Sequence, residues 1–327
     1  MSRTVLGARE LLIARTRIQR YLAKSELLKS HYLSMRIEGE VWLKLESRLP
    51  TGSFKVRGAL NKISTLGDRS TRLVTGSAGN HGLGVAFAAQ VLGFENVAIF
   101  IPETAPSAKV NRLRQFDIDL HSSGTTYEDA HQAALEYASG SDAVYVQAYD
   151  DEQIIAGQGT VGLEIMEDCP TADLVIVPVG GGGLIAGTAV AIKELSPGTQ
   201  IVGAQAEASP SGFLSLRDGV PYDPYDHEET IADGLAGGFG AKPFYIARSL
   251  IDRIELFDEA ALRRSIYTLL NGDRIIAEAS GAVAIAPLLE PDPRLHGKRV
   301  VCVISGSNLE TALLRDILNE FSNRNAH

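Results

Sequence analysis

Short apolar segments rich in β-branched residues alternate along the chain with segments of helical periodicity. The expected strands are Val41–Leu45, Leu73–Thr75, Val97–Ile101, Val144–Val146, Leu174–Val179, Ile201–Gln205 and Val300–Ile304. The expected helices are Val56–Leu66, Gly82–Leu92, Tyr127–Ala138, Ile154–Met166, Leu184–Leu195 and Glu259–Leu270. Several strands are apolar at consecutive positions, which is typical of strands covered on both faces. The alternation therefore predicts an α/β fold in which mostly parallel sheets are flanked by helices.

The composition is that of an ordinary globular protein. Of the 327 residues, 45% are hydrophobic and 22% are charged. The net charge of −9 argues against binding to nucleic acid or to an anionic membrane surface. The two cysteines, Cys169 and Cys302, give neither a disulfide framework nor a metal-ligand spacing. The sequence has no signal-peptide pattern and no apolar run long enough to cross a membrane, so we expect a cytoplasmic protein.

A lysine stands where the first strand gives way to a helix, in the segment PTGSFKVRG at residues 50–58. Cations normally favour the C-terminal end of a helix dipole, so Lys55 at a helix start is unusual for a purely structural residue. One interpretation is a solvated surface lysine. The other is a lysine that forms a Schiff base, because desolvation by apolar neighbours lowers its pKa and frees the amine. Phe54 would then lie against a cofactor ring.

A second junction of strand and helix has the sequence TGSAGNHG at residues 75–82. Its small residues let backbone N–H groups converge on an anion such as a substrate carboxylate. Ser77 and Asn80 add side-chain hydrogen bonds, although both residue types also cap helices. His81 is either a packed histidine or a catalytic base.

Four consecutive glycines, Gly180 to Gly183, precede the helix that begins at Leu184. Glycine lets the backbone turn sharply and present successive N–H groups to a phosphate at a helix N-terminus. The loop lacks the Gly-Lys-Ser/Thr ending of a nucleotide P-loop. It does match a dinucleotide pattern through Gly181, Gly183 and Ala186, so a nicotinamide dehydrogenase is an alternative on this motif alone.

The last junction is CVISGSN at residues 302–308, where Ser305 can either hydrogen-bond a ring nitrogen or cap the next helix. All four junctions follow strands, and open α/β sheets bind ligands at the carboxyl ends of their strands. The four segments are therefore expected to form one site.

Together these segments resemble the fold-type II enzymes that use pyridoxal 5'-phosphate (PLP), and most closely the threonine/serine dehydratase and serine racemase family. The resemblance rests on SFKVRG at residues 53–58 and the four glycines, in that order and spacing. Further matches are ARTRIQRYL at 14–22, ADG at 232–234 and AEASGA at 277–282. The resemblance covers nearly the whole chain. It implies a fold like that of the tryptophan synthase β subunit, PLP as cofactor, a small amino acid as substrate, and a homodimer.

The resemblance also implies a role for each matching residue. Lys55 would hold PLP as a Schiff base and act as the base at the substrate Cα, with Phe54 flanking the ring. Asn80 would meet the ring hydroxyl, and Ser305 would face the pyridine nitrogen. The phosphate would lie on Gly180, Gly181, Gly182, Gly183 and Leu184, and the substrate carboxylate among Ser77, Asn80 and His81.

Differences within the family favour dehydration. Relatives that make cysteine or cystathionine tend to carry valine before the lysine and aspartate after it, whereas Phe54 and Val56 are the dehydratase form. A neutral Ser305 does not hold a proton on the ring nitrogen, so a short-lived carbanion favours loss of the β-hydroxyl. Racemisation needs a second acid–base group opposite the lysine. Serine racemases have a serine there, and this chain has Ala78.

A divalent cation site of the serine racemases is matched only in part. Glu207 and Ser211 fit the pattern, but Phe213 stands at the aspartate position. The sequence therefore leaves the presence of a metal undecided.

The expected enzyme has a larger PLP-binding domain, residues 1–65 and 150–327, and a smaller mobile domain, residues 66–149. It would convert a β-hydroxy amino acid, threonine or serine by default, to a 2-oxo acid and ammonia. Alternatives within the fold type are a dehydratase for 3-hydroxyaspartate, phenylserine or an amino acid derived from hydroxyectoine, and a serine racemase. Outside it, the alternatives are an NAD-dependent dehydrogenase and a binding protein without catalysis. The chain ends soon after an expected helix at Leu309–Phe321, which leaves no room for a regulatory domain and favours a catabolic role.

Overall fold

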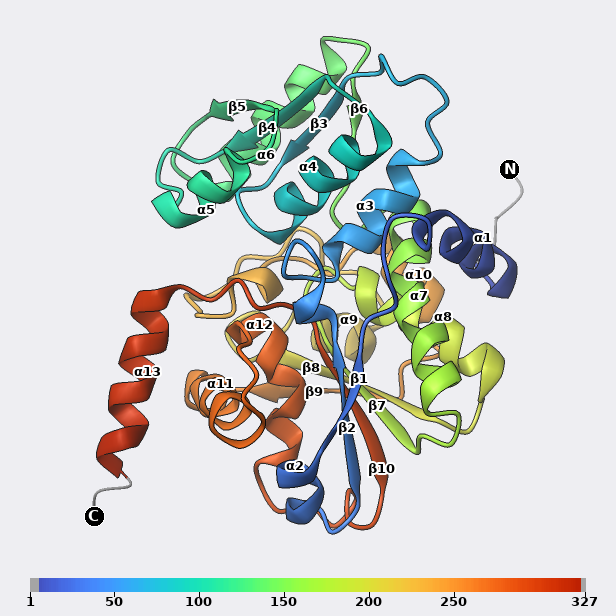
Figure 1. Cartoon of the computed structure of the whole chain (residues 1–327), viewed down its shortest axis with the longest axis vertical. Coiled ribbons are helices and arrows are strands. Elements are labelled where there is room, and N and C mark those ends of the chain that lie inside the picture. Colours follow the sequence, from blue (N-terminus) through green and yellow to red (C-terminus); the bar gives the residue numbers. More distant parts are fainter. Residues whose placement is uncertain (1–5, 325–327) are drawn as a thin grey trace.

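The computed structural model describes residues 6–324 and contains two sheets, one in the upper and one in the lower half of Figure 1. The larger sheet has the order β1-β2-β10-β7-β8-β9. Its strands are β1 (Leu27–Ser30), β2 (Glu40–Leu45), β10 (Arg299–Ile304), β7 (Leu174–Pro178), β8 (Gln200–Ala206) and β9 (Arg253–Phe257). Only β1 runs antiparallel to its neighbour. The smaller sheet, order β5-β4-β3-β6, is parallel throughout. Its strands are β5 (Asp119–Ser122), β4 (Val97–Ile101), β3 (Leu73–Gly76) and β6 (Val144–Tyr145).

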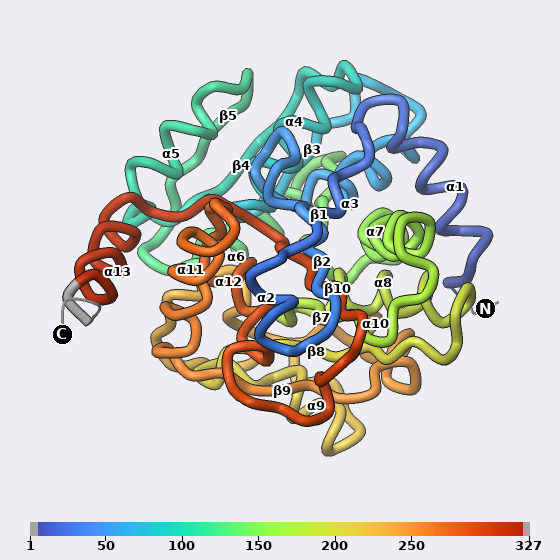
Figure 2. Tube along the Cα trace, turned by 60° about the horizontal axis from the view of Figure 1, so that its bottom comes forward, coloured from blue at the N-terminus to red at the C-terminus, as the bar shows by residue number. Residues whose placement is uncertain are grey.

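Helices flank both sheets, and the predicted α/β fold is confirmed. The α-helices are α1 (Ala8–Ile18), α2 (His31–Arg36), α3 (Lys55–Ile63), α4 (Asn80–Leu92), α5 (Ser107–Leu113), α6 (Tyr127–Ser139), α7 (Glu152–Asp168), α8 (Gly183–Leu195), α9 (Ser211–Asp218), α10 (Ala241–Ala247), α11 (Glu259–Asp273), α12 (Ala279–Ala282) and α13 (Thr311–Arg324). Short 3-10 helices are η1 (Glu46–Arg48), η2 (Asp233–Leu235) and η3 (Val283–Leu288). Figure 2 shows α1 and α13 on opposite sides of the molecule.

The central strands of the larger sheet are buried on both faces, as their continuous apolar sequences predict. In β10, Val301 and Val303 face the core that includes α7 and α8. Val300, Cys302 and Ile304 face the core that includes α11 and η3. Burial raises the pKa of the Cys302 thiol, so this cysteine is an inert packing residue.

Two glycines bring α7 and α8 into close contact. A Cβ on Gly187 would lie 2.3 Å from the carbonyl oxygen of Ile155, and one on Gly159 would lie 2.8 Å from the carbonyl oxygen of Gly187. The backbones therefore approach more closely than larger residues would allow. This packing fixes the N-terminus of α8, where the four glycines lie.

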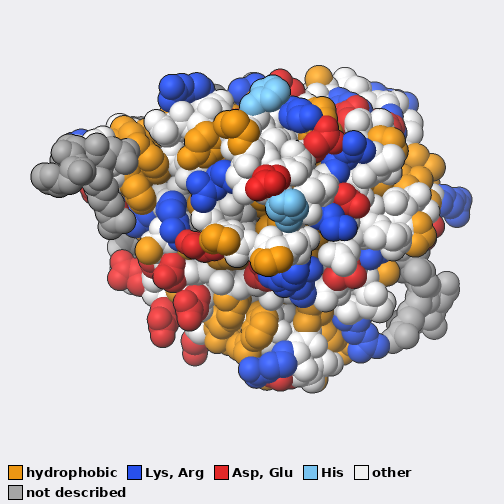
Figure 3. Space-filling model, turned by 90° about the horizontal axis from the view of Figure 1, so that it is seen from below, with side chains coloured by type: hydrophobic (Ala, Val, Ile, Leu, Met, Phe, Trp, Pro, Cys, Tyr) orange, Lys and Arg blue, Asp and Glu red, His pale blue; other side chains and the backbone are white. Residues whose placement is uncertain are grey.

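The surface carries charges of both signs. On the face seen from below, basic and acidic side chains are interspersed with apolar ones (Figure 3). No helix within residues 6–324 is both long and apolar enough to cross a membrane.

Candidate active site

Lys55 is the first residue of α3, and its side chain is partly buried. Its Nζ donates a 3.0 Å hydrogen bond to the carbonyl oxygen of Ala148 and lies 5.3 Å from the centre of the Phe54 ring. Desolvation lowers the pKa of Lys55 to about 8, because a poorly solvated site disfavours the charged amine. More of this amine is therefore neutral and nucleophilic near neutral pH than in an ordinary lysine.

The loop after β10 holds the segment that carries Lys55. The backbone N–H of Phe54 donates a 3.0 Å hydrogen bond to the carbonyl oxygen of Ser305. Ser53 and Gly306 form an isolated antiparallel bridge. The buried Ser305 hydroxyl donates to the carbonyl oxygen of Ser280 at 3.2 Å. The structure thus places the segment of Lys55 and Phe54 beside the loop of Ser305.

Asn80 begins α4, and its amide is held at both ends. Its Nδ2 donates a 2.6 Å hydrogen bond to Oε1 of Glu278, and its Oδ1 accepts a hydrogen bond from Nδ2 of Asn308. Glu278 lies just before α12 and is buried. Desolvation, followed by the nearby charge of Asp233, raises the pKa of Glu278 to about 7.

Ser77 and His81 lie on either side of Asn80 in the sequence. The Ser77 hydroxyl accepts a 3.2 Å hydrogen bond from the N–H of Gly79, which orders the loop before α4. Nε2 of His81 is buried and lies 2.9 Å from the carbonyl oxygen of Val146. Burial, followed by the charge of Lys55, lowers the pKa of His81 to about 3. The ring is therefore neutral and donates to Val146, a geometry typical of a packed histidine.

The four glycines form a turn that accepts no side chains. Gly182 precedes α8 with a φ of 87°, a conformation that L-residues with a side chain rarely adopt. A Cβ on Gly181 would lie 2.3 Å from the Tyr149 ring, and one on Gly182 would lie 2.6 Å from the Phe239 ring. The first turn of α8 leaves backbone N–H groups without intrahelical partners. A bare backbone at a helix N-terminus fits a phosphate group.

A buried ionic network connects α3 to the neighbouring elements. Arg57 pairs with Glu46 and Glu164 at 2.7 Å each, and Nζ of Lys44 lies 2.6 Å from Glu164. Burial alone would raise the pKa of Glu164, but Arg57 and Lys44 lower it. The network joins α3 to β2 and α7. It therefore fixes the orientation of α3, the helix that begins at Lys55.

The family model described as "Pyridoxal-phosphate dependent enzyme" matches residues 18–306. The chain belongs to this family. PLP is therefore its cofactor, which sets aside the nicotinamide dehydrogenase. Lys55, the buried Ser305 and the glycine turn fit the group, since they offer a reactive amine, a neutral hydroxyl and a phosphate cradle within one site.

Two sequence relatives are named as an ammonia-lyase and a dehydratase. The L-threonine ammonia-lyase of Thermotoga maritima is 38% identical over 310 residues, which cover 94% of this chain and 77% of that protein. The catabolic L-threonine dehydratase TdcB of Escherichia coli K12 is 36% identical over 313 residues, 94% of each chain. Among solved structures, threonine deaminase isoform 2 of Solanum lycopersicum has a TM-score of 0.88 at 32% identity, covering 95% of this chain and 87% of that one. Maize serine racemase has a TM-score of 0.88 at 27% identity, covering 99% and 100%. The predicted fold-type II PLP lyase is confirmed.

Three residues of the site were not singled out from the sequence: Tyr149, Glu278 and Asn308. Glu278 gave one usable signal, a carboxylate between small apolar residues in AEASGA. Phe213, at the position that weakened the cation-site match, lies in α9. Among residues 6–324, no group of three or more histidine, cysteine, aspartate or glutamate side chains is placed to hold a metal.

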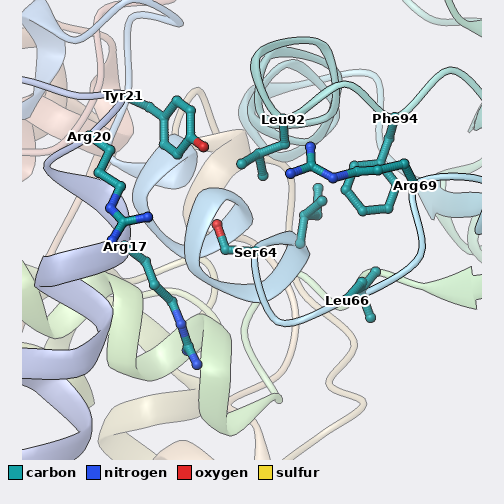
Figure 4. A pocket seen from close by; sticks show the side chains of 9 residues that line it. Arg17, Arg20, Tyr21, Ser64, Leu66, Arg69, Leu92 and Phe94 are labelled. Carbon is teal, nitrogen blue, oxygen red and sulfur yellow. The ribbon is translucent and has the colours of Figure 1, made fainter.

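A separate pocket of about 160 Å³ lies where α1, α3 and α4 end (Figure 4). Arg17, Arg20 and Arg69 line it, and Arg69 stacks over Phe94 at 5.4 Å. Each arginine lies near a helix C-terminus, where a cation stabilises the helix dipole. These arginines are therefore explained by the fold, and none of the site residues named above lines this pocket.

Proposed function

We propose that this protein is a dehydratase that converts a β-hydroxy amino acid, with threonine and serine as reference substrates, to a 2-oxo acid and ammonia. The observation that carries the proposal is the Lys55 amine, with its pKa lowered to about 8, beside Phe54 and the loop of Ser305. The names of the relatives support the same reaction. Water lost from the substrate is regained when the released enamine hydrolyses, so threonine yields 2-oxobutanoate and ammonia with all atoms accounted for.

Bound PLP supplies an electron sink for the electrons left at the substrate Cα. Lys55 would hold the cofactor through its side-chain amine and, in its neutral form, would accept the proton from the substrate Cα. Phe54 would pack against the ring. Ser305 would lie at the ring nitrogen and, being neutral, would not hold a proton there.

The other residues position the cofactor and the substrate. Residues 180–184 would bind the phosphate through backbone N–H groups. Asn80, oriented by Glu278 and Asn308, would meet the ring hydroxyl. Ser77 and His81 line the place of the substrate carboxylate together with Asn80.

Residues 66–149 form the smaller, mobile domain in this proposal, and the rest of the chain forms the larger one. Lys109 of α5 pairs with Asp233 of η2, and Nη2 of Arg112 donates to the carbonyl oxygen of Thr51 at 3.2 Å. These contacts join the two parts beside the site and would hold the closed form, which excludes water from the reaction. We also propose that the protein is a homodimer and acts in the cytoplasm.

The test is ammonia and 2-oxo acid release by the purified holoenzyme from a panel of β-hydroxy amino acids. Threonine, serine, 3-hydroxyaspartate and phenylserine cover neutral, acidic and aromatic side chains. Turnover that is lost in Lys55→Ala supports the proposal. Failure of the holoenzyme to release ammonia from any β-hydroxy amino acid would overturn it.

A further inference from the structure

Five polar side chains that the proposed mechanism does not use form a group, here named the Asp223 cluster. Its members are Tyr127, His131, Tyr145, Tyr149 and Asp223. The Tyr149 hydroxyl hydrogen-bonds both carboxylate oxygens of Asp223, at 3.1 and 3.3 Å. The His131 ring stacks on Tyr127 with centroids 5.8 Å apart, and its Nδ1 lies 2.7 Å from the Tyr145 hydroxyl. The charge of Asp223 also acts on Tyr127 and His131, so the five residues share one region.

One side of the cluster adjoins Lys55 and the glycine turn. Tyr149 directly follows Ala148, whose carbonyl oxygen accepts the hydrogen bond from Nζ of Lys55. The Tyr149 ring fills the space beside Gly181, where a Cβ would meet it at 2.3 Å. Its hydroxyl therefore reaches outward from the cofactor region to Asp223.

The other side of the cluster adjoins the loop proposed for the substrate carboxylate. The Cα of His131 lies 2.8 Å from the position of a Cβ on Gly76, and Ser77 is the next residue. Tyr145 lies on β6, one residue before Val146, whose carbonyl oxygen contacts His81. The cluster thus borders the substrate region between Lys55 and Ser77.

Asp223 lacks a cationic partner in the described part of the chain. No lysine or arginine of residues 6–324 is ion-paired with it, and the charged or polar groups that act on it are Tyr149, Asp150 and His131. Desolvation, followed by the charge of Asp150, raises the pKa of Asp223. Desolvation lowers the pKa of His131, so that ring is neutral near neutral pH. The Asp223 carboxylate is exposed to solvent, so it is open to a ligand cation.

We propose that the Asp223 cluster binds the far end of the substrate side chain and selects a β-hydroxy amino acid that carries a second amino group, on Cγ. This inference rests on the proposed dehydratase function and names its substrate class. With the α-carboxylate at Ser77 and the Cα at Lys55, the side chain would extend toward Tyr149, whose ring lies beside Gly181 and whose hydroxyl contacts Asp223.

The chemistry of the cluster separates this substrate from the other candidates. An ammonium group has three donors, which Asp223 and the tyrosine oxygens can accept. A second carboxylate, as in 3-hydroxyaspartate, would face Asp223 and Asp150 with like charge. The methyl group of threonine would leave Asp223 without a cation.

The first experiment measures binding apart from turnover. L-2,4-Diaminobutanoate and L-2-aminobutanoate have the same chain length, differ by the γ-amino group and lack a β-hydroxyl, so neither loses water. Their dissociation constants follow from titration of the visible absorption band of the holoenzyme. The diamino compound is expected to bind at least about tenfold more tightly, and Asp223→Asn to bring the ratio close to one. The control is Asp226→Asn: Asp226 is an exposed carboxylate of the same loop, as Asp223 is, but it is not part of the cluster, so this variant should keep the wild-type ratio.

Equal affinities in the wild type, or an equal loss for both compounds in Asp223→Asn, would overturn the inference. The second experiment compares ammonia release from threonine and from 2,4-diamino-3-hydroxybutanoate. A higher kcat/KM for the diamino substrate, reduced by Asp223→Asn mainly through KM, supports the inference. Turnover of threonine without that preference overturns the substrate class alone, and ammonia release from neither compound contradicts the dehydratase as well.

Discussion

The side-chain amide of Asn80 and the carboxylate of Glu278 are joined by a 2.6 Å hydrogen bond, although 198 residues separate them in the sequence. The bond links the N-terminus of α4 to the segment before α12. Desolvation raises the pKa of Glu278 to about 7, while the Asn80 hydrogen bond acts in the opposite direction. A carboxyl that titrates near neutral pH therefore holds the residue proposed to meet the cofactor hydroxyl.

Glu278→Gln is expected to stabilise the apoenzyme at alkaline pH relative to the wild type. The pKa of Glu278 is higher in the folded than in the unfolded protein, so its protonated form contributes stability below about pH 4.5. That contribution is lost as the pH rises through about 7, at a cost of up to roughly 3 kcal/mol. Denaturant unfolding at pH 5 and pH 8.5 measures it. A stability difference between the two proteins that does not change with pH would contradict this expectation.

Lys55 is expected to take up PLP faster as the pH rises toward 8. Only the neutral amine attacks the aldehyde, and with a pKa of about 8 its neutral fraction rises about tenfold per pH unit below that value. Apoenzyme is mixed with PLP, samples are quenched with borohydride at successive times, and mass spectrometry gives the fraction of modified protein and hence the rate at each pH. A rate of PLP uptake that reaches its plateau only above pH 10 would show that the amine is solvated.

Lys55→Ala should fold, show no bleachable visible band and lose turnover by at least about 10³-fold.

Gly182→Ala is expected to weaken PLP binding by at least about tenfold. A Cβ at this position meets the Phe239 ring and distorts the turn that presents the N–H groups. Gly219→Ala is the matched control, because Gly219 also has a positive φ of 74°, but no atom lies within 4 Å of the place that its Cβ would take. Both variants should lose about 1 kcal/mol or more from backbone strain, but only Gly182→Ala should lose cofactor on dialysis. Equal cofactor retention would argue against the phosphate cradle.

Arg57→Met is expected to destabilise the protein by about 3–5 kcal/mol, because it leaves Glu46 and Glu164 buried with only Lys44 to balance them. Arg294→Met is the control. The side chain of Arg294 is 60% exposed although it forms ion pairs, and its replacement should lower the free energy of unfolding by less than about 1 kcal/mol. Arg57→Lys should recover part of the stability but not the two-sided pairing. Chemical denaturation of the three variants gives the comparison, and a similar small loss in Arg57→Met and Arg294→Met would contradict the role of the network.

The apolar pattern identified the strands of the sheet interiors and one edge strand, β6, and missed the other three edge strands. β7 and β10 are apolar almost throughout because helices cover both of their faces. β1, β5 and β9 lie at sheet edges, and β5 has the polar sequence DLHS. Whether such a segment forms a strand depends on the neighbouring strand with which it pairs. That strand is a different segment of the chain, so the local sequence pattern carries no information about it.

The site was predicted to the extent that it lies at junctions of strand and helix. Lys55, Asn80, the glycines and Ser305 each occupy such a junction and could be found from their local sequence. Glu278, Asn308 and Asp223 act through partners far away in the chain. Their surroundings exist only after folding. The sequence shows Asn308 and Asp223 as isolated polar residues, and Glu278 only as a carboxylate among small apolar residues.

Ala78 is expected to favour elimination over racemisation. It lies directly before the Gly79-Asn80 turn, and its methyl group can neither donate nor accept a proton, whereas racemisation requires an acid–base group on the face opposite Lys55. Ser77 is not expected to substitute for it, because its hydroxyl is turned toward the N–H of Gly79 in its own loop. We therefore expect L-serine to be lost to pyruvate with negligible D-serine, and Ala78→Ser to produce measurable inversion. Ala78→Thr and Ala78→Val form the matched pair, since they differ chiefly in the hydroxyl. Chiral chromatography of the reaction mixtures is the measurement, and rapid D-serine accumulation by the wild type would show that another group serves the second face.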